Sequence, residues 1–133
     1  MLIEDNLVNQ ELARELLEQE GARVEVAANG RIALELIARH GTQAFDVALV
    51  DLQMPEMDGF ETTQRIRALP DGGCIPLIAM TAHAMVEERE RCLACDMVDH
   101  IAKPIDPDVL VQVIQRWLRR KRVRLRQRSR SSE

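Results

Sequence analysis

Residues Asp46–Gly59 read DVALVDLQMPEMDG, and the rest of the predicted fold is arranged around them. It begins with a short apolar run, Val47–Val50, whose length and composition are typical of a strand buried on both faces. The run ends on the carboxylate of Asp51 and then enters a loop that contains Pro55 and the turn pair Asp58-Gly59. Open α/β sheets place their chemistry at the carboxyl ends of parallel strands. Asp51 is therefore the first candidate for a functional residue.

Short apolar runs alternate with segments of helical spacing on both sides of this stretch. This alternation predicts an α/β fold, a doubly wound five-stranded parallel sheet with helices on both faces. Strands are predicted at residues 1–3, 22–27, 47–50, 76–80 and 98–102, and helices at about residues 7–20, 30–40, 60–69, 87–95 and from 107 onward.

The first predicted strand is truncated, because only Leu2 and Ile3 precede two acidic residues. A short strand leaves the edges of the strands that pair with it partly uncovered, so we expect reduced stability, dimer formation or exchange of elements between chains. Asn6 is a predicted cap of the helix that follows. The helical spacing predicts an apolar stripe on that helix, formed by Leu7, Leu12, Leu16 and Leu17.

The composition restricts the classes of function. The 133 residues fit one domain, and aromatic residues make up only 2%, so the core is aliphatic. Three cysteines, an odd number, favour a reducing cytoplasmic setting. No apolar run approaches the roughly 20 residues of a membrane span.

The net charge of -4 is distributed unevenly along the chain. From Arg116 onward there are nine basic residues and one acidic residue, Glu133, whereas acidic residues predominate before it. The acidic body is therefore not expected to bind nucleic acid specifically. Residues 121–133 are expected to form a disordered, solvated tail, and an electrostatic contact with acidic lipid, nucleic acid or a parent kinase is the alternative.

Polar residues also follow other predicted strands. Glu4 and Asp5 follow the first strand, Thr81 follows the fourth and Lys103 follows the fifth. Carboxylates are ligands that Mg²⁺ prefers, and an aspartate can act as a nucleophile toward phosphorus. A lysine and a hydroxyl can then neutralise charge on phosphoryl oxygens. The shared edge of the sheet therefore predicts an acidic, metal-binding, phosphate-accepting pocket around Asp51.

Four motifs together make the sequence similar to a known family. Over residues 1–120 the chain resembles a response-regulator receiver domain, and this resemblance implies the flavodoxin-like strand order 2-1-3-4-5. The motifs are IEDN at Ile3–Asn6, ALVDLQMPEMDGFE at Ala48–Glu61, IAMTAHAM at Ile78–Met85 and IAKPI at Ile101–Ile105.

The resemblance implies a role for each residue of the predicted pocket. Asp51 is the implied phosphoacceptor, and Mg²⁺ is the implied cofactor. The family also implies a cis peptide bond between Lys103 and Pro104. The implied metal ligands are Glu4, Asp5, Asp51 and the backbone carbonyl of Gln53, and the implied partners of the phosphoryl group are Lys103 and the switch hydroxyl Thr81.

Two positions depart from the family pattern. His100 stands where the family carries the aromatic ring that follows the switch threonine. Histidine is smaller and more polar, although it can still rotate as a planar ring. Asp96 stands in a loop where the family often has glycine.

The wording of LVNQELA (Leu7–Ala13) and TAHAM (Thr81–Met85) resembles receivers fused to sensor histidine kinases. The implied partner is a histidine kinase or a histidine phosphotransfer domain. The chain is then expected to be part of a hybrid kinase, membrane-anchored or not, or a shortened gene product. It is not expected to be a stand-alone enzyme, since it catalyses only its own phosphorylation and dephosphorylation.

Two other functions stay open at this point. A Mg²⁺-dependent phosphatase with an aspartyl intermediate carries a second aspartate two residues after the nucleophile, where this chain has Gln53. A degenerate, phosphate-independent interaction domain is compatible with the short first strand but not favoured by the intact acidic set.

Cys92 and Cys95 have C-x-x-C spacing, for which packing is favoured over redox or metal chemistry. His83 is a candidate for tuning the lifetime of the phosphate.

Overall fold

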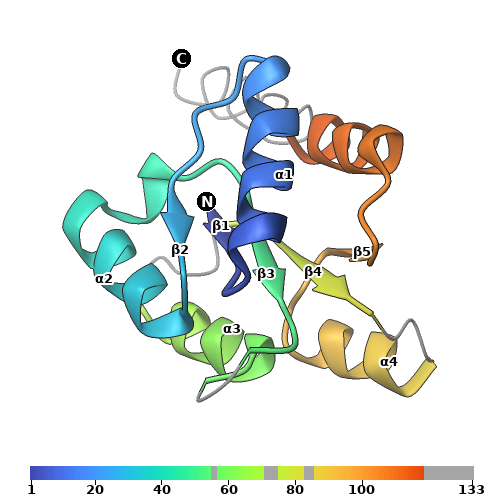
Figure 1. Cartoon of the computed structure of the whole chain (residues 1–133). Helices are drawn as coiled ribbons and strands as arrows, with labels where there is room; N and C mark the ends of the chain where they lie inside the picture. Colours follow the sequence, from blue (N-terminus) through green and yellow to red (C-terminus); the bar gives the residue numbers. More distant parts are fainter. Residues whose placement is uncertain (55–56, 71–74, 83–85, 119–133) are drawn as a thin grey trace, which may run out of the picture.

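The computed structural model of this protein describes residues 1–54, 57–70, 75–82 and 86–118. Five parallel strands form one sheet in the order β2-β1-β3-β4-β5, as the sequence predicts. The arrowheads of β2, β3 and β4 point the same way in Figure 1, so their carboxyl ends share one edge of the sheet. The strands are β1 (Leu2–Ile3), β2 (Val26–Ala27), β3 (Ala48–Asp51), β4 (Leu77–Thr81) and β5 (Asp99–Ala102).

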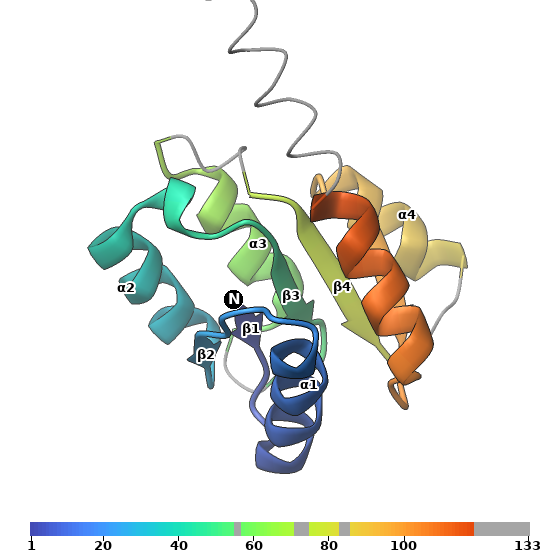
Figure 2. The same cartoon turned by 90° about the horizontal axis from the view of Figure 1, so that it is seen from above.

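Helices cover both faces of this sheet (Figures 1 and 2). The helix α1 and the last helix lie on one face, whereas α2 and α3 lie on the other. One buried apolar cluster contains residues of α2, α3 and α4, so α4 lies on the same face of the sheet as α2 and α3. The helical elements are α1 (Leu7–Gln19), α2 (Gly30–His40), the short η1 (Thr42–Ala44), α3 (Gly59–Arg67), α4 (Val86–Ala94) and a last helix described over residues 107–118.

Two apolar cores fill the space between the sheet and the helices. Successive strand residues point to opposite faces, and the strands divide accordingly. Val50 and Ala79 pack in the core under α2, α3 and α4, whereas Leu49 and Ile78 pack in the core under α1 and the last helix. All four residues of β3 are buried. The prediction of a central strand buried on both faces is therefore confirmed.

The first two strands are short. Residues Leu2 and Ile3 pair with Val26 and Ala27 on one side and with β3 on the other. The prediction of a strand over residues 22–27 is too long, because strand β1 offers ladder partners for only two of these residues. The first strand is as short as predicted.

The predicted apolar stripe of α1 is partly wrong. Leu7 and Leu12 are 73% and 42% exposed, whereas Ala13 and Leu17 are buried. Successive helical residues are about 100° apart, so Leu12 lies about 140° around the helix from Leu17. Leu12 therefore cannot share the face that packs on the sheet. Leu16 is half-buried at the margin of that core.

Side-chain caps fix where three helices begin. Asn6 accepts a hydrogen bond from the backbone of Asn9, so its predicted cap is confirmed. Asn29 caps α2 in the same way. Asp58 accepts a hydrogen bond of 2.9 Å from the N–H of Glu61, so α3 begins at Gly59, one residue before the predicted start.

At the end of α4, Asp96 stands at the position where the resembled family often has glycine. Asp96 has a positive φ of 61°. Its N–H donates to the carbonyl of Leu93, and the N–H of Met97 donates to the carbonyl of Cys92, each at 3.0 Å. This pair of bonds is the Schellman pattern that ends helices through one left-handed residue.

We expect Asp96→Gly to raise the free energy of unfolding by about 0.5–1 kcal/mol, because glycine has no Cβ to strain at positive φ. Its greater freedom in the unfolded chain offsets part of this gain. Equilibrium unfolding in urea measures the change. Asp96→Ala is the control and is expected to be no more stable than the parent chain. A stabilising alanine or a destabilising glycine would contradict this explanation.

Two contacts attach the last helix to β5. Asp99 accepts hydrogen bonds from Trp117 Nε1 at 3.0 Å and from Arg116 at 3.2 Å.

The predictions for Pro55, for His83 and for the basic tail concern residues outside those that the structure describes. In the described part of the chain, every helix is too short or too polar to span a bilayer.

Candidate functional site

Three strand ends bring the predicted pocket residues together. Asp51 is the last residue of β3, Glu4 and Asp5 follow β1, and Lys103 follows β5. Strand β1 lies between β2 and β3, so its acids are adjacent to Asp51 in the sheet. Carboxylate oxygens of Glu4, Asp5 and Asp51 all lie within 4.8 Å of one another.

Lys103 bridges the two buried carboxylates of this group. Its Nζ lies 3.0 Å from Glu4 Oε2 and 3.0 Å from Asp51 Oδ2. Glu4 and Asp51 are each 1% exposed. Backbone N–H groups complete their hydrogen bonding, because Asn6 donates to Glu4 at 3.2 Å and Gln53 donates to Asp51 Oδ1 at 3.0 Å. The lysine therefore compensates charge that the fold removes from water.

The electrostatics of the pair follow from this burial. Burial raises the pKa of Glu4, and the hydrogen bond from Lys103 opposes that shift. Burial by itself lowers the pKa of Lys103, but hydrogen bonds to Asp51 and Glu4 outweigh it, so the pKa of Lys103 is raised. Lys103 therefore stays a cation at neutral pH, at the place where negative charge gathers.

The acidic cluster fits a hard divalent cation. Two oxygens bound to one Mg²⁺ at about 2.1 Å lie about 3–4 Å apart, so small side-chain movements bring these carboxylates to coordination distance. Asp5 is exposed, which leaves the cluster open to solvent on its side. All three donors are carboxylate oxygens, the ligand type that Mg²⁺ prefers. The residues present therefore fit the cofactor that the sequence implies.

Gly59 packs behind Asp51, and sequence reasoning identified it only as part of a turn. A Cβ at Gly59 would lie 2.5 Å from the backbone oxygen of Asp51 and 2.8 Å from Leu52 Cα. Glycine therefore lets the start of α3 approach the end of β3 closely. The pair Asp58-Gly59 in the sequence signals a turn, but not which backbone it approaches.

The Thr81 side chain lies on the α4 side of the site. Thr81 is buried at the end of β4, and its hydroxyl donates a hydrogen bond to the carboxylate of Glu88 in α4. His100 is half-buried in β5, opposite Ala79 of β4. By strand alternation, His100, Ala79 and Thr81 share the face under α4. Sequence reasoning did not identify Glu88.

Two further predictions from the sequence concern the cysteine pair and the peptide bond after Lys103. Cys92 is buried in the core under α4, burial raises the pKa of its thiol, and both Cys92 and Cys95 are free thiols. These facts favour the packing interpretation of the C-x-x-C spacing. The peptide bond between Lys103 and Pro104 is cis, as the family resemblance implies.

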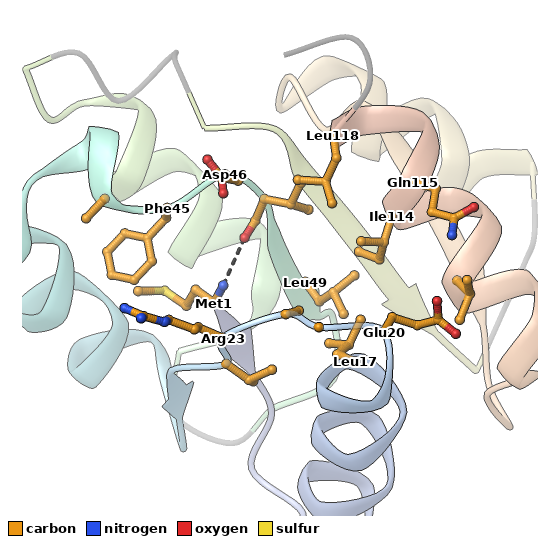
Figure 3. Close-up of a pocket in the computed structure, with 16 residues that line it drawn as sticks. Met1, Leu17, Glu20, Arg23, Phe45, Asp46, Leu49, Ile114, Gln115 and Leu118 are labelled. Carbon is orange, nitrogen blue, oxygen red and sulfur yellow. Dashed lines mark hydrogen bonds between the residues drawn. The ribbon is translucent and has the colours of Figure 1, made fainter. Parts of the chain in front are cut away.

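A cavity of about 580 Å³ lies at the other end of the sheet (Figure 3). Leu17 of α1 and Ile114 of the last helix line it, and the amino group of Met1, bonded to the carbonyl of Val47 at 2.9 Å, lies on its wall. None of the acidic-cluster residues lines this cavity. The cavity is therefore separate from the candidate site.

Comparisons with known proteins agree with the fold. The model of the response regulator receiver domain family matches residues 1–115. An uncharacterized 14.6 kDa protein of Leptolyngbya boryana is 39% identical over 117 residues, which cover 88% of this chain and 87% of the relative. Sensor histidine kinase GacS of Pseudomonas protegens is 39% identical over 120 residues, which cover 88% of this chain and 13% of the kinase.

One similar solved structure contains a metal ion. The receiver domain of a sensor histidine kinase of Pseudomonas aeruginosa PAO1 is 38% identical, with a TM-score of 0.75 over 88% of this chain and 93% of that chain. That structure has a magnesium ion coordinated in its active site cleft. The chain spans only 6–14% of the length of the histidine kinases that it matches. With most of its length matched by the family model, the chain belongs to the response regulator receiver domain family of two-component signalling.

Proposed function

We propose that Asp51 accepts a phosphoryl group from a phosphohistidine of a histidine kinase or of a histidine phosphotransfer domain. The observation that supports this most is the Lys103 ammonium, which lies 3.0 Å from Asp51 inside an acidic cluster. This arrangement pairs a carboxylate nucleophile with a cation beside it. Phosphoryl transfer depends mainly on such positioning and on charge neutralisation.

The transfer forms one bond and breaks another. A carboxylate oxygen of Asp51 forms a P–O bond to the phosphoryl group while the P–N bond to the donor imidazole breaks. The electron pair of that bond stays on the imidazole nitrogen, which takes up a proton. Lys103 then turns from the carboxylates to the phosphoryl oxygens, where its three N–H donors offset the added charge.

Mg²⁺ is the proposed cofactor. Glu4, Asp5, Asp51 and the backbone carbonyl of Gln53 are the proposed protein groups that hold it. When bound, the ion neutralises charge on the phosphoryl oxygens. Without a metal ion, Lys103 would be the cation that offsets the repulsion between a phosphoryl group and the three carboxylates. The acidic cluster therefore supports the assignment of Mg²⁺.

The proposed readout uses Thr81 and His100. The Thr81 hydroxyl would turn toward the phosphoryl group on Asp51, and the His100 ring would move into the space that Thr81 leaves. Their common place on the face under α4 supports this coupling. The output would then be a change of the surface formed by α4 and β5.

The wider setting is also part of the proposal. Residues 1–120 would form the receiver domain and residues 121–133 a basic tail. The similarity to receivers within histidine kinases supports a place in a hybrid kinase or a phosphorelay in the cytoplasm. Dimer formation or element exchange through the short β1 stays part of the prediction.

The decisive test is incubation with Mg²⁺ and acetyl phosphate, followed by intact-mass spectrometry. We expect one added phosphoryl group, no addition in Asp51→Asn, and no addition when EDTA replaces Mg²⁺. Asp46→Asn, which removes an acid at the opposite end of the same segment, is the control and should be phosphorylated normally. A phosphate-independent interaction domain would give no adduct, and a phosphatase would turn over acetyl phosphate without accumulating one.

A further inference from the structure

Glu88 is a carboxylate that the proposed transfer does not use. It lies in the first turn of α4, and it accepts a hydrogen bond from the Thr81 hydroxyl. The backbone carbonyl of Thr81 also accepts a 2.8 Å hydrogen bond from the N–H of Lys103. The backbone of Thr81 is therefore hydrogen-bonded to the end of β5, so its side chain changes direction by rotation about χ1.

The position of Glu88 on α4 turns its side chain toward the sheet. Cys92 lies one turn after Glu88 on the same side of the helix and is buried in the core under α4. Glu88 is half-buried, whereas Glu87 and Glu90 are exposed. Glu88 is therefore the acid of this part of α4 that faces the sheet beside Thr81.

A threonine hydroxyl has one proton to donate. Thr81 therefore cannot donate both to Glu88 and to a phosphoryl oxygen on Asp51. We propose that Glu88 is a positioning residue that holds Thr81 in its resting rotamer and so opposes the phosphoryl-bound conformation. This inference rests on the proposed roles of Asp51 and Thr81.

The strength of this opposition follows from linkage. If a ligand binds only the minor conformation, its apparent affinity is reduced in proportion to the fraction of molecules in that conformation. Removing one hydrogen bond to a charged group changes such an equilibrium by about tenfold. The loss of the Glu88 acceptor should therefore tighten the binding of a phosphoryl analogue by a similar factor.

The experiment titrates beryllofluoride into the Mg²⁺-loaded chain and follows the Thr81 methyl signal by NMR. Glu88→Ala should lower the apparent Kd about tenfold, and the free variant should show a Thr81 signal shifted toward the bound position. Glu88→Gln should lie between, with about a threefold change, because a neutral amide carbonyl accepts a weaker hydrogen bond. Glu87→Ala removes the same charge from the same turn and should change the Kd by less than about twofold.

A second background separates the hydrogen bond from the charge. In Thr81→Ala both the donor and the threonine methyl are absent, so there the Kd is followed by the ¹⁹F signal of bound beryllofluoride. Adding Glu88→Ala in this background should change the Kd by less than about twofold. Equal tightening in both backgrounds would mean that loss of negative charge acts alone, which overturns the role of Glu88. An unchanged Kd in Glu88→Ala overturns it as well. If the parent chain itself binds no beryllofluoride, the proposed function of Asp51 fails instead.

Discussion

Replacing Lys103 with methionine is expected to lower the free energy of unfolding by about 3 kcal/mol in metal-free buffer at about pH 7. The Nζ of Lys103 lies 3.0 Å from both Glu4 and Asp51, which are buried. Methionine keeps most of the side-chain volume but removes the cation and its hydrogen bonds. Two carboxylates then stay buried with like charge and no counterion. Equilibrium unfolding in urea with EDTA measures the loss.

Arg116→Met is the matched control. Arg116 also pairs with a carboxylate, Asp99, at 3.2 Å, but its side chain is exposed. Exposed ion pairs contribute about 0–1 kcal/mol, so the control should lose no more than this. Similar losses in the two variants would show that burial gives the Lys103 pair no special weight.

The loss in Lys103→Met should depend on pH. Burial raises the pKa of Glu4, and the hydrogen bond from Lys103 opposes that rise. Without Lys103 the pKa of folded Glu4 rises further above its unfolded value. A carboxyl group whose folded pKa lies above its unfolded pKa favours the folded state most at a pH below the unfolded pKa. This stabilisation is lost as the pH rises through the folded pKa. The deficit of the variant should therefore narrow from about pH 7 to about pH 5, and a constant deficit would contradict the explanation.

The same change should slow phosphorylation. In the proposed transfer Lys103 offsets charge on the phosphoryl oxygens, so Lys103→Met should lower the initial rate of adduct formation by about 100-fold at saturating Mg²⁺. Mg²⁺ should also stabilise Lys103→Met more than the parent chain, because the ion supplies the missing positive charge. A variant that is destabilised but phosphorylated at the parental rate would limit Lys103 to a structural role.

The sequence predicts the centre of this fold better than its margins. Strands β3 and β4 are continuous apolar runs because both of their faces are buried, and each ends on a polar residue at the shared edge. That pattern is local, so it can be read without the structure. The length of β2 cannot, because a ladder needs a partner, and Leu2 and Ile3 offer only two positions.

The site shows the same division. The meeting of Asp51 with Glu4, Asp5 and Lys103 follows from topology alone, since parallel strands end at one edge. The contact between Thr81 and Glu88 depends on the rotation of α4 about its axis. Nothing in the sequence separates Glu88 from the neighbouring acids of that helix.

The close approach at Gly59 leads to the second large effect. Gly59→Ala is expected to lower the free energy of unfolding by about 3 kcal/mol, because a Cβ would lie 2.5 Å from the Asp51 backbone oxygen and 2.8 Å from Leu52 Cα. These are backbone atoms of a buried strand end, so they cannot rotate away. Helix propensity alone predicts the opposite sign, a gain of up to about 1 kcal/mol for alanine. Urea unfolding therefore decides between propensity and contact.

Gly30→Ala is the matched control, since Gly30 is also the first residue of a helix. A Cβ there would meet side-chain atoms of Thr62 and Met57, the latter at 2.6 Å. Met57 can rotate away, whereas Thr62 is buried and its hydroxyl donates to the carbonyl of Asp58. We expect a loss of about 1–2 kcal/mol for this variant, smaller than for Gly59→Ala because side-chain atoms can shift further than the backbone of a buried strand end. Gly59→Ala should also slow adduct formation on Asp51, whereas Gly30→Ala should not, because only the first clash moves the backbone of the acceptor. Equal effects of the two variants on stability and adduct rate would show that α3 can shift away from β3 without disturbing Asp51.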